Sequence, residues 1–272
     1  MTRFRATLTY DGTAYHGFQR QAGETPTIQR AVERAIGDVT GQVATVVGAG
    51  RTDSGVHATG QVIAFDVDWQ HEDGDLLRAL NALLPDDIAL QDISRQEGFH
   101  PRFDAVSRVY RYVVIVAKHR QPLLRYRAWH IPTTLDGEAM QNAAQLLVGD
   151  HDFAAFGKPP QGESTVRTVL NSDWQVTLAT DEQRFETWTY TIEANAFLKQ
   201  MVRRIVGSLV DVGRGRWTVD VFRKAFERAR LVEKGTIAPP DGLTLLKVCY
   251  PETVAEGTDE AAKMPAGGTN HG

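Results

Sequence analysis

The order of apolar patterns along the chain occurs twice, and this repeat limits the folds that the chain can adopt. Alternating apolar residues, as from Phe4 to Tyr10, predict strands, whereas apolar residues spaced three or four apart predict helices. In the first half, strands are predicted at 4–10, 43–47, 61–67 and 88–94, and helices at 26–37 and 75–84. In the second half, strands are predicted at 107–117, 168–179, 184–193 and 243–250, and helices at 135–148, 197–212 and 219–229. Both halves therefore have the order βαββαβ.

This order is that of the ferredoxin-like unit. We expect an α+β fold in which two ferredoxin-like βαββαβ halves, residues 1–104 and 105–250, join into one extended, mostly antiparallel sheet. The helices would cover one face of the sheet, and a cleft on the other face would hold the functional site. In the first helix we expect Thr25 as the N-cap, Pro26 in the first helical position and Gly37 at the end.

The composition is that of a globular protein without membrane contact. The 272 residues, 42% of them hydrophobic, can bury one large core or two moderate ones. No apolar run reaches the ~18 residues of a membrane span, and the start of the chain has no apolar stretch long enough for a signal peptide. The single cysteine, Cys249, cannot form a disulfide within the chain. We therefore expect a cytoplasmic protein.

The net charge of −4 is unevenly distributed. Residues 251–272 carry four acidic side chains against Lys263 alone, and their Gly, Ala and Thr content predicts a disordered acidic tail. Without this tail the remaining chain is close to neutral.

A second uneven stretch is basic. From Arg95 to Arg127 there are eight Lys and Arg against two acidic residues, with aromatic residues among and beside them. Such a stretch is typical of a surface that binds a polyanion, and an ordinary solvated face is the alternative. The aromatic residues are Phe103, Tyr110, Tyr112, Tyr126 and Trp129.

The segment GAGRTDSGVHATGQV, residues 48–62, has four glycines in its first thirteen positions, which lets the backbone come close to another group. Its spacing matches neither the dinucleotide motif, which needs glycine at position 53, nor the P-loop, which needs Lys and Ser or Thr after Gly55. What remains is a lone carboxylate, Asp53, near Arg51. Such a carboxylate suits a nucleophile or base acting on a substrate with anionic groups, and the alternative is an Asp that caps its own turn.

Arg203 lies in the predicted helix FLKQMVRRIVGSLVDVG, on a row shared with Val206, Gly207 and Val210. A guanidinium among apolar residues is costly unless an anion pairs with it, so we expect an anion there. The alternative is a side chain that lies over apolar surface with its charged end in water.

Six segments in order along residues 1–250 give the chain a strong resemblance to the transfer-RNA pseudouridine synthase A family. The Gly-rich segment is similar to that family's signature, and five further segments are similar to its other motifs. They are YDGTAYHGFQRQ with TPTIQRAVERAI, SRVYRYVV, GDHDFAAFG, AFLKQMVRRIVGSLVDVG and APPDGLTLLKVCY. Ser54 and Arg108 stand where the family more often has Ala and Lys.

The resemblance implies isomerisation of uridine to pseudouridine at positions 38, 39 and 40 of the anticodon arm of transfer RNA, by a homodimer, without cofactor or metal. It implies Asp53 as the catalytic carboxylate and Arg203 as its ion-pair partner. It also implies Arg51 as a contact to the RNA and the displaced base, Tyr110 as the aromatic beside the uracil, and Leu243 as an apolar wall of the pocket. The nucleotide would have to be flipped out of its stack.

Other interpretations of the residues remain open. The chain could be a non-catalytic RNA-binding or RNA-remodelling module with a ferredoxin-like sheet, although no RNP-type aromatic segment is present. It could also be an N-glycosidase that uses Asp53 to release a base. Tyr110 could be a core residue, His57 a hydrogen-bonding residue of its loop, and His151 with Asp152 a turn feature and not a metal site.

Overall fold

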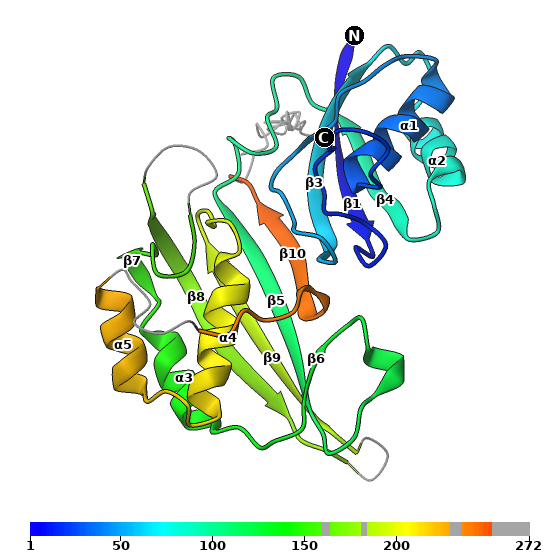
Figure 1. Cartoon of the computed structure of the whole chain (residues 1–272). Coiled ribbons are helices and arrows are strands. Elements are labelled where there is room, and N and C mark those ends of the chain that lie inside the picture. The colour runs from blue at the N-terminus through cyan, green and yellow to red at the C-terminus, as the bar shows by residue number, and fades with distance from the viewer. Residues whose placement is uncertain (159–163, 181–183, 229–234, 252–272) are drawn as a thin grey trace, which may run out of the picture.

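One sheet of ten strands runs through the residues that the computed structural model describes, 1–158, 164–180, 184–228 and 235–251 (Figure 1). The strand order is β4-β1-β3-β10-β5-β9-β8-β7, with β2 paired to β3 and β6 paired to β5. All pairs are antiparallel except β10 with β3 and β6 with β5. The strands are β1 (Thr2–Tyr10), β2 (Val47–Gly48), β3 (His57–Val67), β4 (Ile88–Arg95), β5 (Ser107–Val116), β6 (Trp129–Ile131), β7 (Gly149–Asp152), β8 (Val166–Thr177), β9 (Glu186–Ala194) and β10 (Leu243–Cys249).

The predicted α+β class and the two ferredoxin-like halves are confirmed by the topology. The first half has the strand order β4-β1-β3-β2 and the second has β10-β5-β9-β8, so the same arrangement occurs twice. Strand β10 is the last in the chain, yet it lies between β3 and β5 and joins the halves into one sheet (Figure 1). The helices are α1 (Ile28–Thr40), α2 (Asp73–Leu83), α3 (Gly137–Gln145), α4 (Met201–Gly213) and α5 (Val219–Glu227).

The main core lies on one face of this sheet. A row of paired residues crosses both halves on that face, from Tyr10 through Ala58, Leu245 and Tyr110 to Ile192, and every side chain in it is buried. The helices cover this face, as expected. The opposite face of β1, β5 and β9 is more polar, because residues such as Arg3, Arg111 and Thr189 alternate with the buried ones; an antiparallel sheet can expose one face in this way.

The first helix begins and ends later than predicted. Its N-cap is Thr27 and not Thr25, since the Thr27 side chain accepts a hydrogen bond from a backbone N–H of the first turn. Gly37 does not end the helix, which continues to Thr40. The residue that ends it is Gly41, which has φ +70° and so adopts the left-handed conformation typical of a helix C-cap.

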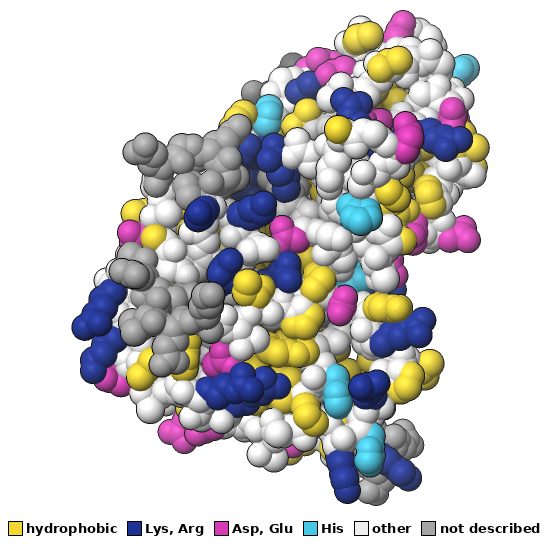
Figure 2. Space-filling model, in the orientation of Figure 1, with side chains coloured by type: hydrophobic (Ala, Val, Ile, Leu, Met, Phe, Trp, Pro, Cys, Tyr) yellow, Lys and Arg dark blue, Asp and Glu magenta, His cyan; other side chains and the backbone are white. Residues whose placement is uncertain are grey.

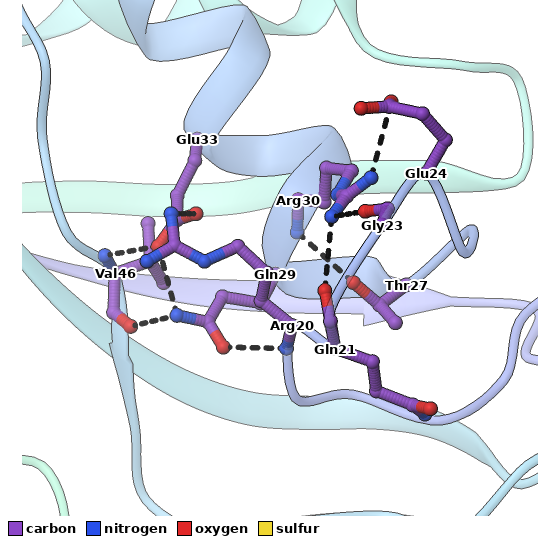
Figure 3. Close-up of polar contacts among 9 residues, drawn as sticks. All are labelled: Arg20, Gln21, Gly23, Glu24, Thr27, Gln29, Arg30, Glu33 and Val46. Atoms are coloured by element: carbon purple, nitrogen blue, oxygen red, sulfur yellow. Dashed lines mark hydrogen bonds and ion pairs between the residues drawn. The ribbon is translucent and has the colours of Figure 1, made fainter.

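The strand predicted at 43–47 is largely wrong, because side chains of α1 bond the backbone that would have formed it (Figure 3). The Glu33 carboxylate accepts from the Val46 N–H at 3.1 Å, and the Gln29 amide donates to the Val46 carbonyl at 3.1 Å. Gln29 also accepts from the Arg20 N–H at 2.8 Å. With its N–H and its carbonyl both bonded to side chains, Val46 needs no partner strand, and only Val47–Gly48 pairs with β3.

Several other boundaries differ from the prediction. Strand β3 begins at His57, four residues earlier than predicted. Helix α4 begins at Met201, four residues later than predicted, because Gln200 has φ 62° and interrupts the helix. Strands β6 and β7 were not predicted. The predicted end of α5 at residue 229 and the acidic tail from residue 252 lie outside the described residues. No helix in the described ranges is long and apolar enough to cross a membrane.

The buried tyrosines make the fold sensitive to alkaline pH. Burial raises the pKa of Tyr10 to about 12, partly offset by its hydrogen bond with Thr52, and burial also raises the pKa of Tyr112 and Tyr190. In the unfolded chain these groups ionise near pH 10. Between pH ~10 and ~12 the unfolded chain therefore binds fewer protons than the folded protein, so the free energy of unfolding should fall as pH rises.

Urea denaturation at pH 8, 10 and 11 measures this effect. We expect Tyr10→Phe to show a shallower fall above pH 10 and to cost ~1 kcal/mol at pH 8, because it leaves the buried Thr52 hydroxyl without its tyrosine partner. Equal slopes in both proteins would contradict the prediction.

Candidate active site

A cavity of about 930 Å³ lies between the N-terminal segment that precedes α1 and the beginning of α4. Tyr110 and Leu243 line it, and both belong to the face of the sheet that carries the core and the helices. The cavity thus opens on the helix-bearing face, in the space between the two groups of helices, and not on the opposite face as expected. In Figure 2, dark blue Lys and Arg side chains surround an acidic side chain near the middle of the molecule.

The Gly-rich loop between β2 and β3 is held in place by the segment YDGTAYHGFQRQ, residues 10–21. The Thr52 carbonyl accepts from the Phe18 N–H at 3.1 Å, and the Thr52 hydroxyl lies 2.8 Å from the Tyr10 hydroxyl. Gly17 has φ +92°, and a Cβ there would lie 2.8 Å from the Thr52 carbonyl oxygen, so only glycine fits this close approach. These contacts fix the backbone immediately before Asp53.

The Asp53 carboxylate is directed to Arg203 and not to its own turn. Oδ2 of Asp53 lies 3.2 Å from Nη1 of Arg203, which is the expected ion pair. The turn is closed by the main chain, where the Asp53 carbonyl accepts from the Val56 N–H at 3.2 Å. Among the described residues, no other side chain pairs with the Asp53 carboxylate. Its Oδ1 oxygen is thus left for a ligand.

Arg203 is fixed by two hydrogen bonds with Ala238, one from its side chain and one through its backbone. Its Nε donates to the Ala238 carbonyl at 2.8 Å, and its own carbonyl accepts from the Ala238 N–H at 3.0 Å. The side chain is 15% exposed and that of Asp53 is 29% exposed, so the ion pair is partly withdrawn from water and is screened less than a surface pair. A fixed guanidinium beside Asp53 stabilises a negative charge at that position.

Tyr110 and Leu243 form apolar parts of the cavity wall, and both are buried. The Tyr110 ring meets the Phe197 ring edge to face, with centroids 5.0 Å apart. Burial raises the pKa of Tyr110 and outweighs the opposing effect of the nearby Arg108 cation, so the hydroxyl stays protonated at neutral pH. Tyr110 is therefore both a core residue and a cavity residue, which combines the two interpretations made from the sequence.

Arg51 differs from Arg203 in that it is exposed at the cavity. Within the part of the chain that the structure describes, no hydrogen bond or ion pair holds its guanidinium. The side chain is therefore available to a ligand.

Positive charge dominates the cavity. Besides Arg203, six cationic side chains line it, against Asp53 as the single carboxylate among the described lining residues. Two of the six belong to the predicted basic stretch, and one is Arg51 of the Gly-rich loop. The other three, which were not predicted as site residues, come from segments far apart in the sequence. The six are Arg20, Arg51, Arg102, Arg108, Arg167 and Lys199.

The basic stretch from Arg95 to Arg127 is not one surface. Arg95 pairs with Asp73 and Arg127 pairs with Asp11, while the alternation of β5 places Arg111 on the face opposite Tyr110. A linear count of charges cannot separate the two faces of a strand.

Arg108 is a buried cation whose partners are carbonyls. Its guanidinium donates to the carbonyls of Ala49, Arg102, Ala105 and Asn195 at 2.7 to 3.2 Å. It thereby connects the Gly-rich loop, the segment before β5 and the segment after β9.

The two histidines considered in the sequence have structural roles. His57 Nδ1 accepts from the Gly12 N–H at 3.2 Å and lies 3.0 Å from the Asp11 carboxylate, and its Nε2 lies 3.2 Å from the Asp241 carbonyl. These bonds reach beyond its own loop. His151 Nε2 lies 2.9 Å from the Val148 carbonyl. The described residues contain no group of three or more side chains suited to hold a metal ion.

Comparison with known families now adds to this geometry. The model of a family described as tRNA pseudouridine synthase matches residues 6–104 and 143–251, which is more than half of the chain. The chain belongs to the tRNA pseudouridine synthase family. Asp53 lies in the first range matched by the tRNA pseudouridine synthase model and Arg203 in the second, so the ion pair joins the two matched ranges. Tyr110 lies between these ranges in the sequence.

Individual relatives are similar over almost the full length. A protein named tRNA pseudouridine synthase A from Methylacidiphilum infernorum is 42% identical over 253 residues, covering 91% of this chain and 95% of the relative. One of the same name from Chloroflexus aurantiacus is 45% identical, covering 90% and 87%. One from a Geobacillus species is 40% identical, covering 91% and 98%.

The four carbonyls around Arg108 generate a stability prediction. Arg108→Met would leave these partly or fully buried carbonyls without their donor, so the free energy of unfolding should drop by ~2–4 kcal/mol in urea denaturation. The matched control is Arg111→Met on the opposite face of the same strand, where we expect a change within ~0.5 kcal/mol. Equal effects of the two substitutions would show that the carbonyl bonds do not stabilise the fold.

Proposed function

We propose that this chain isomerises uridine to pseudouridine in tRNA, at positions 38, 39 and 40 of the anticodon arm, with Asp53 as the catalytic carboxylate. The observation that carries the proposal is the pairing of Asp53 with Arg203 in a cavity lined by cations, in a member of the tRNA pseudouridine synthase family. A nucleic acid provides the anionic groups that such a cavity attracts.

The reaction breaks the bond between N1 of uracil and C1′ of the ribose and forms a bond between C5 and C1′. C5 loses a proton and N1 gains one, so atoms and electrons balance and no redox partner is needed; we therefore propose no cofactor or metal. Asp53 would attack C1′, attack the uracil ring or abstract a ribose proton, and each of these needs an ionised carboxylate. Arg203 places a fixed guanidinium 3.2 Å from this carboxylate.

The target nucleotide must leave its stack to reach Asp53, at a cost of a few kcal/mol. Arg51, exposed and without a protein partner among the described residues, would contact the RNA and the displaced base. The Tyr110 ring would lie beside the uracil, and Leu243 would form the apolar wall that keeps the detached base in place. We further propose a homodimer that acts in the cytoplasm.

Two other functions would use the same site differently. A non-catalytic RNA-binding module would bind tRNA without changing it, and an N-glycosidase would release free uracil. The Asp53–Arg203 pair favours chemistry over simple binding, because a carboxylate inside a cationic cavity weakens the attraction for phosphate, which a purely RNA-binding surface would not favour.

Incubation of the purified chain with an unmodified tRNA that carries uridines at positions 38 to 40, with chelator and no cofactor, tests the proposal. We expect pseudouridine at those positions, mapped by chemical tagging and primer extension. Binding without product would support the non-catalytic module, and release of uracil would support the N-glycosidase.

Substitution of the carboxylate isolates its role. Asp53→Asn should abolish product, because a neutral amide can neither attack nor accept a proton, while the Kd for tRNA stays within a few-fold of that of the unsubstituted chain. The matched control is Asp38→Asn on the exposed surface of α1, which should turn over normally. Undiminished turnover by Asp53→Asn would remove Asp53 from the mechanism.

A further inference from the structure

Phe103 is an exposed aromatic side chain at the edge of the cavity. It is 73% exposed, yet it is one of the residues that line the cavity around Asp53. Its place at the edge of the cavity leaves this aromatic surface accessible to a ligand that enters there.

The turn that carries Phe103 is firmly held. The His100 N–H donates to the Asp104 carboxylate at 2.8 Å, and the Asp104 N–H donates to the His100 carbonyl at 3.1 Å. His100 Nδ1 accepts from the N–H groups of Arg102 and Phe103, each at 3.2 Å. Phe103 is therefore presented by a defined turn and not by a loose loop.

One face of the Phe103 ring is already stacked. The His100 imidazole lies 4.2 Å away, centroid to centroid, with 28° between the planes. The high exposure of Phe103 leaves the rest of its ring surface open. The Arg102 guanidinium lies over the same ring, 5.8 Å from its centroid, so a cation accompanies the aromatic surface. A flat aromatic surface with an adjacent cation is what a nucleobase and its phosphate recognise.

The guanidinium of Arg108 bonds both the turn that carries Phe103 and the Gly-rich loop. Nη2 of Arg108 donates to the Arg102 carbonyl at 2.7 Å and to the Ala49 carbonyl at 3.1 Å. Ala49 precedes Arg51 and Asp53 in the Gly-rich loop, so Arg108 fixes Phe103 relative to the reacting carboxylate. At about 930 Å³ the cavity is near the upper end of the ~300–1,000 Å³ typical of ligand sites, which leaves room for more than one nucleotide.

We propose that Phe103, backed by His100, is a stacking subsite for a second unpaired nucleobase of the RNA, a neighbour of the uridine that enters at Asp53. This subsite rests on the proposed function for its substrate. It would hold the displaced neighbour while the target uridine lies in the cavity, and so contribute to binding more than to chemistry.

A cycle of protein and RNA changes tests the subsite. Binding to tRNA is measured in the Asp53→Asn background, so that the RNA is not turned over, with intact tRNA and with tRNAs that carry an abasic residue on either side of the target uridine. We expect Phe103→Ala to raise the Kd for intact tRNA by about tenfold, which is typical of one base stacked on an aromatic ring. On one of the two abasic tRNAs the same substitution should change the Kd by less than about twofold.

Variants at the same position separate stacking from general apolar contact. The Phe103→Trp variant should have the same Kd for intact tRNA as the chain with Phe103. The Phe103→Leu variant should have a Kd as high as that of Phe103→Ala. The control is Leu83→Ala, which removes an exposed apolar side chain at the end of α2 and should leave binding unchanged. With Asp53 intact, Phe103→Ala should raise KM and leave kcat nearly unchanged.

Three results would overturn the subsite: unchanged binding by Phe103→Ala, equal losses on intact and both abasic tRNAs, or full binding by Phe103→Leu. The test is independent of the isomerase proposal, because a chain that made no pseudouridine could still lose tRNA binding through Phe103. Conversely, if the unsubstituted chain makes pseudouridine and the Phe103→Ala variant binds tRNA as tightly as the unsubstituted chain does, only the stacking subsite is disproved.

Discussion

The pairing of β10 between β3 and β5 is the constraint on which the rest of the structure depends. Its parallel contact with β3 is short, from Thr244 opposite His57 to Leu245 opposite Ala58, yet it turns two separate units into one sheet. It aligns the buried row of residues across both halves and places the Gly-rich loop of one half opposite α4 of the other. Without this strand, Asp53 and Arg203 would belong to different units.

The electrostatic arrangement follows from that placement. Among the described residues, the charged side chains that line the cavity are seven cations and one carboxylate, a balance that attracts an anionic polymer. The carboxylate lies beside a guanidinium that is itself fixed by the Ala238 carbonyl. Arg203 and Arg51 differ in that the guanidinium of Arg203 is bonded to the protein, whereas that of Arg51 has no hydrogen bond or ion pair among the described residues. Arg108, bonded only to carbonyls, holds the loops in register and adds positive charge at the same time.

Regular alternation made some elements predictable almost to the residue. Strands β1 and β5 agree with the prediction within two residues at each end, because buried and partly buried positions alternate along most of their length. Strand β4 agrees equally well, although its alternation is confined to its first residues. Prediction failed where side chains took over the role of a neighbouring strand. Val46 is the clearest case, since Gln29 and Glu33 of α1 satisfy its backbone groups (Figure 3). The ends of α1 were misplaced because two Thr and two Gly residues lie near them, and only the actual backbone angles choose between them.

The sequence by itself determined the βαββαβ repeat, the unusual character of Asp53 and the need of Arg203 for an anion, because each of these follows from local spacing and the cost of burying charge. The tertiary structure decided that these two residues are partners, that the cavity opens on the helix-bearing face, and that Arg102 and Arg108 line it while Arg111 does not. Asp53 and Arg203 are 150 residues apart. Local patterns carry no information about such a contact, which depends on how β10 aligns the two halves.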